Sequence, residues 1–177
     1  MKRKALTITL AAVMAMGTCA VTASAADGDT YTIGICQLVQ HEALDAATQG
    51  FKDEIVKELG EDAVTFDEQN AQGDSNTCST IINSFVSNNV DLILANATPA
   101  LQAAAAGTSD IPILGTSVTE YGVALGLDDF DGTVGGNIYG TAELAPLDEQ
   151  AAILQELFPD AKNVGLLYCS AEANSQY

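Results

Sequence analysis

The sequence predicts an α/β fold built on a parallel sheet, and three observations support this class. From Tyr31 onward, short runs of strand-forming residues alternate with segments of helical periodicity. One of the short runs, 90–95, is almost wholly apolar, as expected for a strand that is covered on both faces. The chain has 177 residues of which 47% are hydrophobic, which is enough for a core and too many for a disordered chain.

Residues 1–25 have the layout of a signal peptide. A basic tripeptide at 2–4 precedes an apolar stretch, 5–16, that is too short to span a bilayer, and 23–25 reads Ala-Ser-Ala, the small-x-small pattern of a cleavage site. An alternative is lipidation at Cys19, because the residues before it loosely resemble a lipobox. Both alternatives predict an exported protein in the periplasm or at the cell surface, with or without a lipid anchor.

The chain is strongly acidic, with a formal net charge of −18. Removal of the predicted signal peptide would leave only lysines 52, 57 and 162 to oppose all 24 acidic residues. Such a surface repels nucleic acids and anionic membranes, so we expect neither as a partner. The ordinary function of this charge is to keep an exported protein soluble.

Three strand and helix pairs are predicted in the first half of the chain. Spacings of three and four between apolar residues define the helical faces, and turn or capping residues define the ends. The predicted elements are a strand at 31–39, a helix after His41 that closes at Gly60, a strand at 63–68, a helix opened by Asp74 or Ser75 that ends at 88–89, the strand at 90–95, and a helix with Thr98 as N-cap and Pro99 at its first position.

The second half is predicted to leave this lobe and enter another. A strand at 111–114 and a strand within 137–143 flank a loop rich in glycine and aspartate, and a helix at 148–158 with Ala151, Leu154 and Leu157 inward precedes a strand at 164–169. One helix and one strand cannot bury their apolar faces alone. We therefore expect one complete lobe at 26–145 and, after a hinge crossing at Ala145-Pro146, a truncated second lobe at 146–177.

The cysteines and the missing motifs argue against an enzyme. Cys36, Cys78 and Cys169 are widely spaced and form no CxxC, so small buried hydrophobes are the expected explanation, with a bridge between Cys36 and Cys78 as an alternative. No GxGxxG, P-loop, HExxH or GxSxG occurs. A nucleophile and base pair of Cys36 and His41 is disfavoured because Cys36 lies in an apolar run. We expect no catalysis, no cofactor and no metal.

Five strings, in this order along the chain, resemble one family. They are GICQLVQHEALDAATQGF (34–51), FDEQNAQGD (66–74), DLILANATPA (91–100), GGN (135–137) and LLYCSAEANS (166–175). The combination resembles the ABC-transporter substrate-binding family of tryptophan- and tyrosine-binding lipoproteins, the TrpX-like group. Glu42 departs from the proline that is common in the family after the histidine, and 119–121 reads Thr-Glu-Tyr in place of the more usual Thr-Asp-Pro.

The resemblance implies a fold and a function. The fold is type I periplasmic-binding-protein-like, with two Rossmann-like lobes that close on a ligand in the manner of a Venus flytrap. The function is capture of an amino acid, with an aromatic one favoured, by a monomeric receptor that delivers it to an ABC permease and its ATPase. A receptor of the same fold for a sugar or nucleoside, and a surface adhesin, are the alternatives.

The predicted ligand-binding residues follow the predicted strands, because ligands of open parallel sheets bind outside the carboxyl ends of the strands. An amino acid needs donors for its carboxylate, acceptors for its ammonium group and a wall for its side chain. The residues are His41, Asn70, Gln72, Asp74, Thr98, Thr116, Ser117, Glu172, Asn174 and Ser175.

The segment after residue 25 contains no arginine, so we expect helical N–H groups at Thr98 to hold the carboxylate. Glu172 is the expected partner of the ammonium group, and His41 and Tyr121 are possible partners for a ring. Each has an ordinary alternative, which is helix capping for Thr98 and Asp74, turn chemistry for Thr116 and Ser117, and plain surface exposure for His41 and Tyr121.

Overall fold

Five strands and their helices account for most of residues 30–175, the part of the chain that the computed structural model describes. The predicted signal segment, including Cys19, lies outside that range. The strands are β1 (Tyr31–Gln37), β2 (Val64–Asn70), β3 (Leu92–Asn96), β4 (Ile113–Val118) and β5 (Ile138–Ala142). The helices are α1 (Glu42–Leu59), α2 (Ser75–Ser87), α3 (Thr98–Gly107), α4 (Tyr121–Leu125) and α5 (Leu147–Leu157), with 3-10 turns η1 (Glu61–Ala63) and η2 (Ala173–Ser175).

All neighbouring strands of the sheet are parallel, in the order β2-β1-β3-β4-β5. The predicted α/β class with a parallel sheet is therefore confirmed. Because the chain moves from β1 outward to β2 and then back across to β3, the connections change direction between β1 and β3. Sheets of this order bind ligands at such a switch point, outside the carboxyl ends of the strands.

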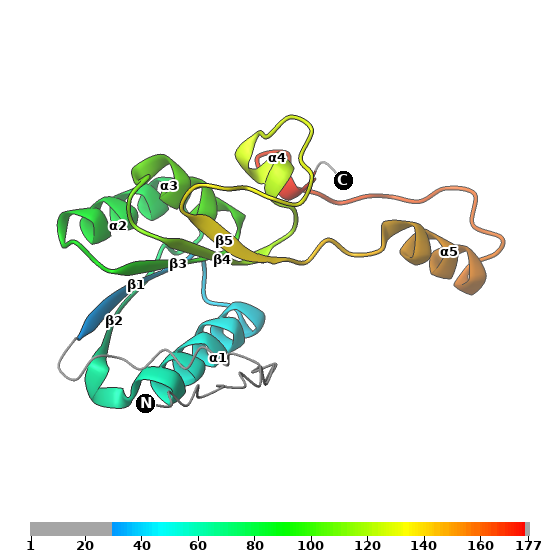
Figure 1. The fold of residues 1–177 in the computed structure, drawn as a ribbon. Helices are drawn as coiled ribbons and strands as arrows, with labels where there is room; N and C mark the ends of the chain where they lie inside the picture. Colours follow the sequence, from blue (N-terminus) through cyan, green and yellow to red (C-terminus); the bar gives the residue numbers. More distant parts are fainter. Residues whose placement is uncertain (1–29, 176–177) are drawn as a thin grey trace, which may run out of the picture.

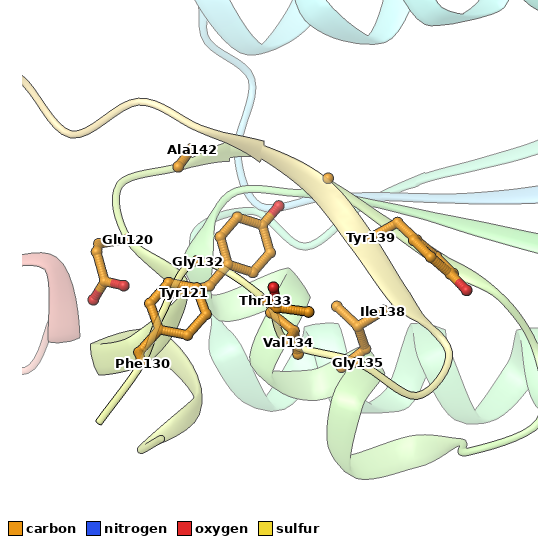
Figure 2. Close-up of a pocket in the computed structure, with 11 residues that line it drawn as sticks. Glu120, Tyr121, Phe130, Gly132, Thr133, Val134, Gly135, Ile138, Tyr139 and Ala142 are labelled. Carbon is orange, nitrogen blue, oxygen red and sulfur yellow. The ribbon is translucent and has the colours of Figure 1, made fainter. Parts of the chain in front are cut away.

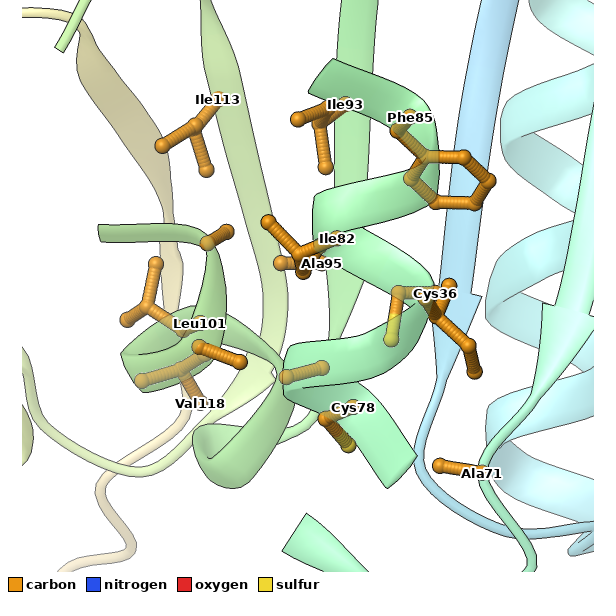
Figure 3. Close-up of a cluster of buried hydrophobic side chains, with 14 of the residues drawn as sticks. Cys36, Ala71, Cys78, Ile82, Phe85, Ile93, Ala95, Leu101, Ile113 and Val118 are labelled. Atoms are coloured by element: carbon orange, nitrogen blue, oxygen red, sulfur yellow. The ribbon is translucent and has the colours of Figure 1, made fainter. Parts of the chain in front are cut away.

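Helices cover both faces of the sheet (Figure 1). On one face, α1 lies over a small cluster that contains Ile33, Ile35 and Leu94. On the other face, α2 and α3 lie over the larger cluster, in which Ile82, Phe85 and Leu101 pack with Ile93 and Ile113 (Figure 3). Burial on both faces explains why β1 and β3 read as nearly continuous apolar runs.

Gly34 lets α2 lie close to the sheet. A Cβ atom at this position would lie 2.6 Å from Cδ2 of the fully buried Phe85 ring, so the absence of a side chain on β1 makes room for the ring. The sequence alone does not mark Gly34 as special, because the contact depends on a residue 51 positions away in the chain.

The sequence predicted a loop for the whole stretch between β4 and β5, but the structure differs. It contains the short helix α4, whose first turn is capped by Glu120: its carboxylate accepts from the N–H groups of Gly122 at 2.6 Å and Val123 at 2.8 Å. The prediction missed this helix because its five residues are too few to show periodicity.

The last segment differs most from the prediction. Helix α5 is present but stands away from the sheet (Figure 1), and its predicted inward residues Ala151, Leu154 and Leu157 are exposed. The predicted strand at 164–169 is not a strand, since no other strand of residues 30–175 pairs with it, and Cys169 is exposed rather than buried. Backbone in the strand region needs a hydrogen-bonded neighbour to become a strand.

No helix within residues 30–175 combines the length and apolar character needed to cross a bilayer.

Candidate functional site

The carboxyl ends of four strands bring polar residues side by side. In the register of the sheet Asn70 of β2 pairs with Gln37 of β1, Gln37 with Asn96 of β3, and Asn96 with Thr116 of β4. The loops that follow these strands and the starts of α1, α2 and α3 lie at the same edge, which we call the carboxyl edge. Seven of the ten predicted ligand-binding residues are gathered there: His41, Asn70, Gln72, Asp74, Thr98, Thr116 and Ser117.

His41 is the N-cap of α1. Its Nδ1 accepts from the N–H of Ala43 at 3.2 Å, so the neutral ring carries its proton on Nε2. The side chain is exposed. His41 therefore serves as a cap and also presents its ring and one donor to the solvent side of the carboxyl edge.

The turn after β2 uses its polar side chains to hold its own backbone. Asn70 Oδ1 accepts from the N–H of Gln72 at 2.9 Å, and Asp74 Oδ1 accepts from the N–H of Asn76 at 2.7 Å as the N-cap of α2. Gly73 has φ of 83°, which confirms the predicted positive φ. The second carboxylate oxygen of Asp74 and the exposed Gln72 side chain make no hydrogen bond within residues 30–175.

The start of α3 corrects one prediction. Ala97, not Thr98, is the N-cap, and Thr98 is the first helical residue. Ala97 has φ of 92° and ψ of 157°, a strained conformation for a residue with a Cβ, and no side chain caps the helix. Thr98 is only 4% exposed, and its hydroxyl has no hydrogen-bond partner in the described part of the chain.

The end of β4 lies next to this helix start. The N–H of Ala97 donates to the carbonyl of Thr116 at 3.0 Å, and Ser117 has φ of 54° at an irregularity in the pairing of β4 with β5. Thr116 and Ser117 are half-buried, and their hydroxyls form no hydrogen bond with any residue in 30–175. They are available donors beside the uncapped helix.

Tyr121 is a core residue that also lines the cavity beside β5, which corrects the interpretation of plain surface exposure. Its side chain is 5% exposed and its hydroxyl donates to the carbonyl of Thr141 at 3.3 Å. A Cβ at Gly115 or Gly140 would collide with this hydroxyl, so both glycines make room for the ring. Burial raises the pKa of the Tyr121 phenol above its usual range.

The three predicted residues of the last segment lie apart from the other seven. Asn174 and Ser175 belong to η2 and Glu172 immediately precedes it, and η2 lies beside α4. Glu172 and Ser175 are half-buried and Asn174 is exposed. The structure thus forms one group of seven residues at the carboxyl edge and a second group of three beside α4.

A cavity of about 480 Å³ lies beside β5 rather than among the predicted residues (Figure 2). Phe130, Val134 and Ile138 form much of its wall, and Glu120, which caps α4, lies at one end. None of the ten predicted residues lines it. We place the candidate site at the carboxyl edge, because free amide and hydroxyl donors gather there, whereas the walls of the cavity are mainly apolar.

Sequence reasoning missed a buried polar group at this edge. Gln37 ends β1, Asn96 ends β3 and Thr48 lies on the inward face of α1, and all three are buried. A signal was present, because each of the two apolar strands ends in a carboxamide. Such a polar residue at the end of a buried strand needs partners that the sequence does not name.

Cys36 and Cys78 lie in the same buried cluster (Figure 3) and are free thiols, so the bridge considered from the sequence is not formed. A hydrogen bond to Cys78 and burial raise the pKa of the Cys36 thiol far above its usual range. A thiol held in its neutral form is a poor nucleophile. Within residues 30–175 no group of three or more His, Cys, Asp or Glu side chains is placed to hold a metal ion.

Comparison with known proteins gives consistent matches. Residues 32–177 match the family described as ABC transporter substrate binding protein. A tyrosine-binding protein of Clostridioides difficile (strain R20291) is 41% identical over 150 residues, which are 81% of this chain and 42% of that protein. The chain therefore spans less than half the length of this relative.

Two solved structures also match. One is an ABC domain from Streptococcus pneumonia in complex with L-Trp, with a TM-score of 0.77, 33% identity and coverage of 84% of this chain and 50% of that chain. The other is the ligand-free, open structure of a substrate binding protein with adhesive properties from Clostridium difficile, with a TM-score of 0.66, 40% identity and coverage of 83% and 50%. The part of the chain described above corresponds to about half of each structure.

Proposed function

Because this chain belongs to the ABC transporter substrate-binding protein family, we propose that it is a solute receptor of an ABC importer and captures an aromatic amino acid. The relative named for tyrosine and the structure that holds L-Trp support this choice of ligand. The proposed receptor works without catalysis, since capture requires only non-covalent contacts. Its proposed location is outside the cytoplasm, and its proposed partners are the permease and ATPase of the importer.

The start of α3 is the observation that carries the proposal. Helix N-termini have free N–H groups and a partial positive charge that together favour a carboxylate. Side chains cap α1, α2 and α4, whereas α3 and α5 have no side-chain cap. Of these two, α3 begins at the carboxyl edge, and the unpartnered hydroxyl of Thr98 lies in its first turn. We propose that the ligand carboxylate binds here, assisted by Thr116 and Ser117.

The remaining predicted residues supply the other contacts of an amino acid. The ammonium group is proposed to bind the free oxygen of Asp74, with Asn70 and Gln72 adjacent. Glu172, which lies apart from these residues beside α4, is proposed to reach the ammonium group when the receptor closes on its ligand. The exposed ring of His41 is proposed to lie against the aromatic side chain of the ligand, where stacking and apolar contact stabilise it. Asn174 and Ser175 are proposed to contact the ligand from the same side as Glu172.

A substitution at Ala97 tests the carboxylate position. Ala97→Asp places a negative charge beside the free N–H groups of α3, whereas Ala97→Gly relieves the strained φ and leaves those groups free. Binding of L-tyrosine and L-tryptophan is measured by ligand-observed NMR, with D-ribose and adenosine as competing classes. Because the chain spans about half the length of its relatives, we expect both aromatic amino acids to bind the parent chain and Ala97→Gly only weakly, and Ala97→Asp to bind about tenfold more weakly still.

Two results would contradict this design in different ways. Unchanged affinity in Ala97→Asp, with its fold intact by circular dichroism, would remove the carboxylate from α3 but leave the receptor function in place. Binding of D-ribose or adenosine in preference to both amino acids would replace the proposed ligand class.

Adhesion is a second candidate function, favoured by one observation. The relative described as having adhesive properties is 40% identical to this chain over 83% of its length. The test is attachment of fluorescent beads coated with the chain to cultured epithelial cells, with and without saturating L-tyrosine. Beads coated with an unrelated acidic protein provide the control, and equal attachment of both bead types would reject adhesion.

A further inference from the structure

Three buried polar side chains lie directly beneath the proposed ligand site. Gln37 is 4% exposed, Thr48 is 3% exposed and Asn96 is fully buried. They come from β1, α1 and β3, and Gln37 and Asn96 are paired in the register of the sheet at its carboxyl edge. We call these three residues the edge network.

Hydrogen bonds join the edge network to α1. Asn96 Nδ2 donates to the carbonyl of Leu44 at 2.8 Å and to Thr48 Oγ1 at 2.9 Å. Thr48 Oγ1 donates to Gln37 Oε1 at 2.7 Å, and Gln37 Nε2 donates to Asp45 Oδ1 at 2.6 Å. The first two turns of α1 are therefore attached to the ends of both β1 and β3.

Asn96 has the central place in this arrangement. It is followed in the chain by the strained Ala97 and by Thr98, the first residue of α3. Through Leu44 it also holds the helix whose N-cap is His41. The Asn96 carboxamide thus connects the start of α3, which is proposed to bind the ligand carboxylate, with the start of α1, whose His41 is proposed to contact the ligand ring.

If the edge network only filled space in the core, its polar side chains would destabilise the fold without a benefit. Buried polar groups without full hydrogen bonding destabilise a fold, and Asn96 Oδ1 has no partner within residues 30–175. An apolar side chain would fill the same volume without that cost. Polar residues that persist at such a cost, next to a strained backbone, are typical of positions where geometry is needed for function.

We propose that Asn96 is a positioning residue for ligand capture, which holds the start of α1 against the β3–α3 turn so that His41 and Thr98 keep a fixed spacing. The inference rests on the proposed function, because the spacing matters only if one ligand contacts both residues. It assigns no ligand contact to Asn96 itself. The effect on binding is exerted through α1 and α3.

Thr48 offers the cleanest test, because Asn96→Leu risks unfolding the chain. Thr48→Val keeps the shape of the side chain and removes the hydroxyl that joins Asn96 to Gln37, whereas Thr48→Ser keeps that hydroxyl. Ile33→Val is the matched control, since it weakens packing under the same face of the sheet at the opposite end of β1. Thermal unfolding midpoints of the variants are measured first, so that affinities are compared at known stability.

Two measurements follow on each variant. Affinity for L-tyrosine and L-tryptophan is measured by ligand-observed NMR, and amide hydrogen exchange at 43–48 is measured by mass spectrometry. In Thr48→Val we expect about tenfold weaker binding and about tenfold faster exchange, because a buried bond that held α1 is lost. We expect Thr48→Ser and Ile33→Val to retain the affinity and the exchange rates of the parent.

Each outcome decides the proposal. Loss of affinity in Thr48→Val but not in Ile33→Val supports positioning, and equal affinity in both variants overturns it. If the parent chain binds neither amino acid, the proposed function fails. In that case the amide exchange rates at 43–48 still show whether the edge network holds α1 in place. Equal exchange rates in Thr48→Val and Ile33→Val would reject the idea that it does.

Discussion

The close contact between Gly34 and Phe85 allows a quantitative test of the core. In Gly34→Ala the new Cβ would lie 2.6 Å from Cδ2 and 2.7 Å from Cγ of the Phe85 ring. Carbon atoms in contact prefer about 3.5–4.0 Å, so the ring or the strand must move by about 1 Å. The ring is fully buried and has no solvent to move into.

We expect Gly34→Ala to lower the free energy of unfolding by about 1–3 kcal/mol, the usual cost of overpacking. Urea denaturation followed by circular dichroism measures this change. Gly50→Ala is the matched control, because Gly50 is an exposed position of α1 with no atom within 4 Å of an added Cβ. Alanine is the better helix former, so Gly50→Ala should instead stabilise the chain by about 0.5–1 kcal/mol.

A double substitution checks the cause. Phe85→Leu removes part of the ring that the new methyl group would meet, so Gly34→Ala should cost at least about 1 kcal/mol less in that background than in the parent. The reasoning is refuted if Gly34→Ala leaves stability within about 0.5 kcal/mol of the parent. It is also refuted if the cost of Gly34→Ala is the same in both backgrounds, because the ring would then not be the obstacle.

Three further predictions concern the site and its surroundings. Burial raises the pKa of Tyr121 above its ordinary value of 10.0, so its neutral form is favoured by the fold; the resulting stability is present below that value and is lost as the pH rises through the raised pKa. Urea midpoints between about pH 8 and about pH 11 should therefore fall more steeply for the parent than for Tyr121→Phe, and parallel curves would contradict this. Asp74→Ala should cost about 0.5–2 kcal/mol through loss of the α2 cap, whereas Asp74→Asn should keep the cap and weaken amino-acid binding; equal affinity in Asp74→Asn would remove Asp74 from the ammonium site. Cys169 is exposed while Cys36 and Cys78 are buried, so Cys169→Ser should abolish one fast-reacting equivalent in a thiol titration, and fast labelling of either buried thiol would contradict the packing.

The fold of residues 31–142 was predictable because it depends on local patterns. Apolar runs and helical spacing predicted all five strands of the sheet and the three helices α1, α2 and α3 that cover it, with ends shifted by a few residues. For example, the first strand was predicted to run to residue 39 but ends at Gln37, because the carboxamide of Gln37 turns inward to bond Asp45 and the chain leaves the sheet there. Strand ends decided by such tertiary bonds are not visible in a hydrophobic pattern.

The predicted strand at 164–169 shows the opposite case. Its residues have strand propensity, but within residues 30–175 no neighbouring strand supplies the hydrogen bonds that a strand requires. The same reason explains why α5 formed as predicted while its apolar side chains are exposed. A local pattern is enough to predict a helix of 11 residues, whereas the burial of its apolar side chains depends on a surface from another part of a fold.

The candidate site was predictable in position but not in its details. The rule that ligands bind at the carboxyl ends of parallel strands led to His41, Asn70 and Thr98, and the topology places all three at that edge. The sequence did not reveal that Thr98 follows the N-cap rather than occupying it, because the strained φ of Ala97 is set by tertiary contacts. The edge network was missed for the same reason, since Thr48 reads as an ordinary helical residue.

The strand order has a consequence for how the chain folds. Among residues 30–175, β1 is the first strand to be synthesised, yet it lies between β2 and β3, so its two ladders cannot both form until Asn96 has left the ribosome. Consecutive strands are joined through crossovers rather than hairpins, and such distant pairing makes folding slower than in a helical bundle held by local contacts. Until β3 has been synthesised, β1 can pair with β2 alone, so one edge of this apolar strand stays unpaired during synthesis.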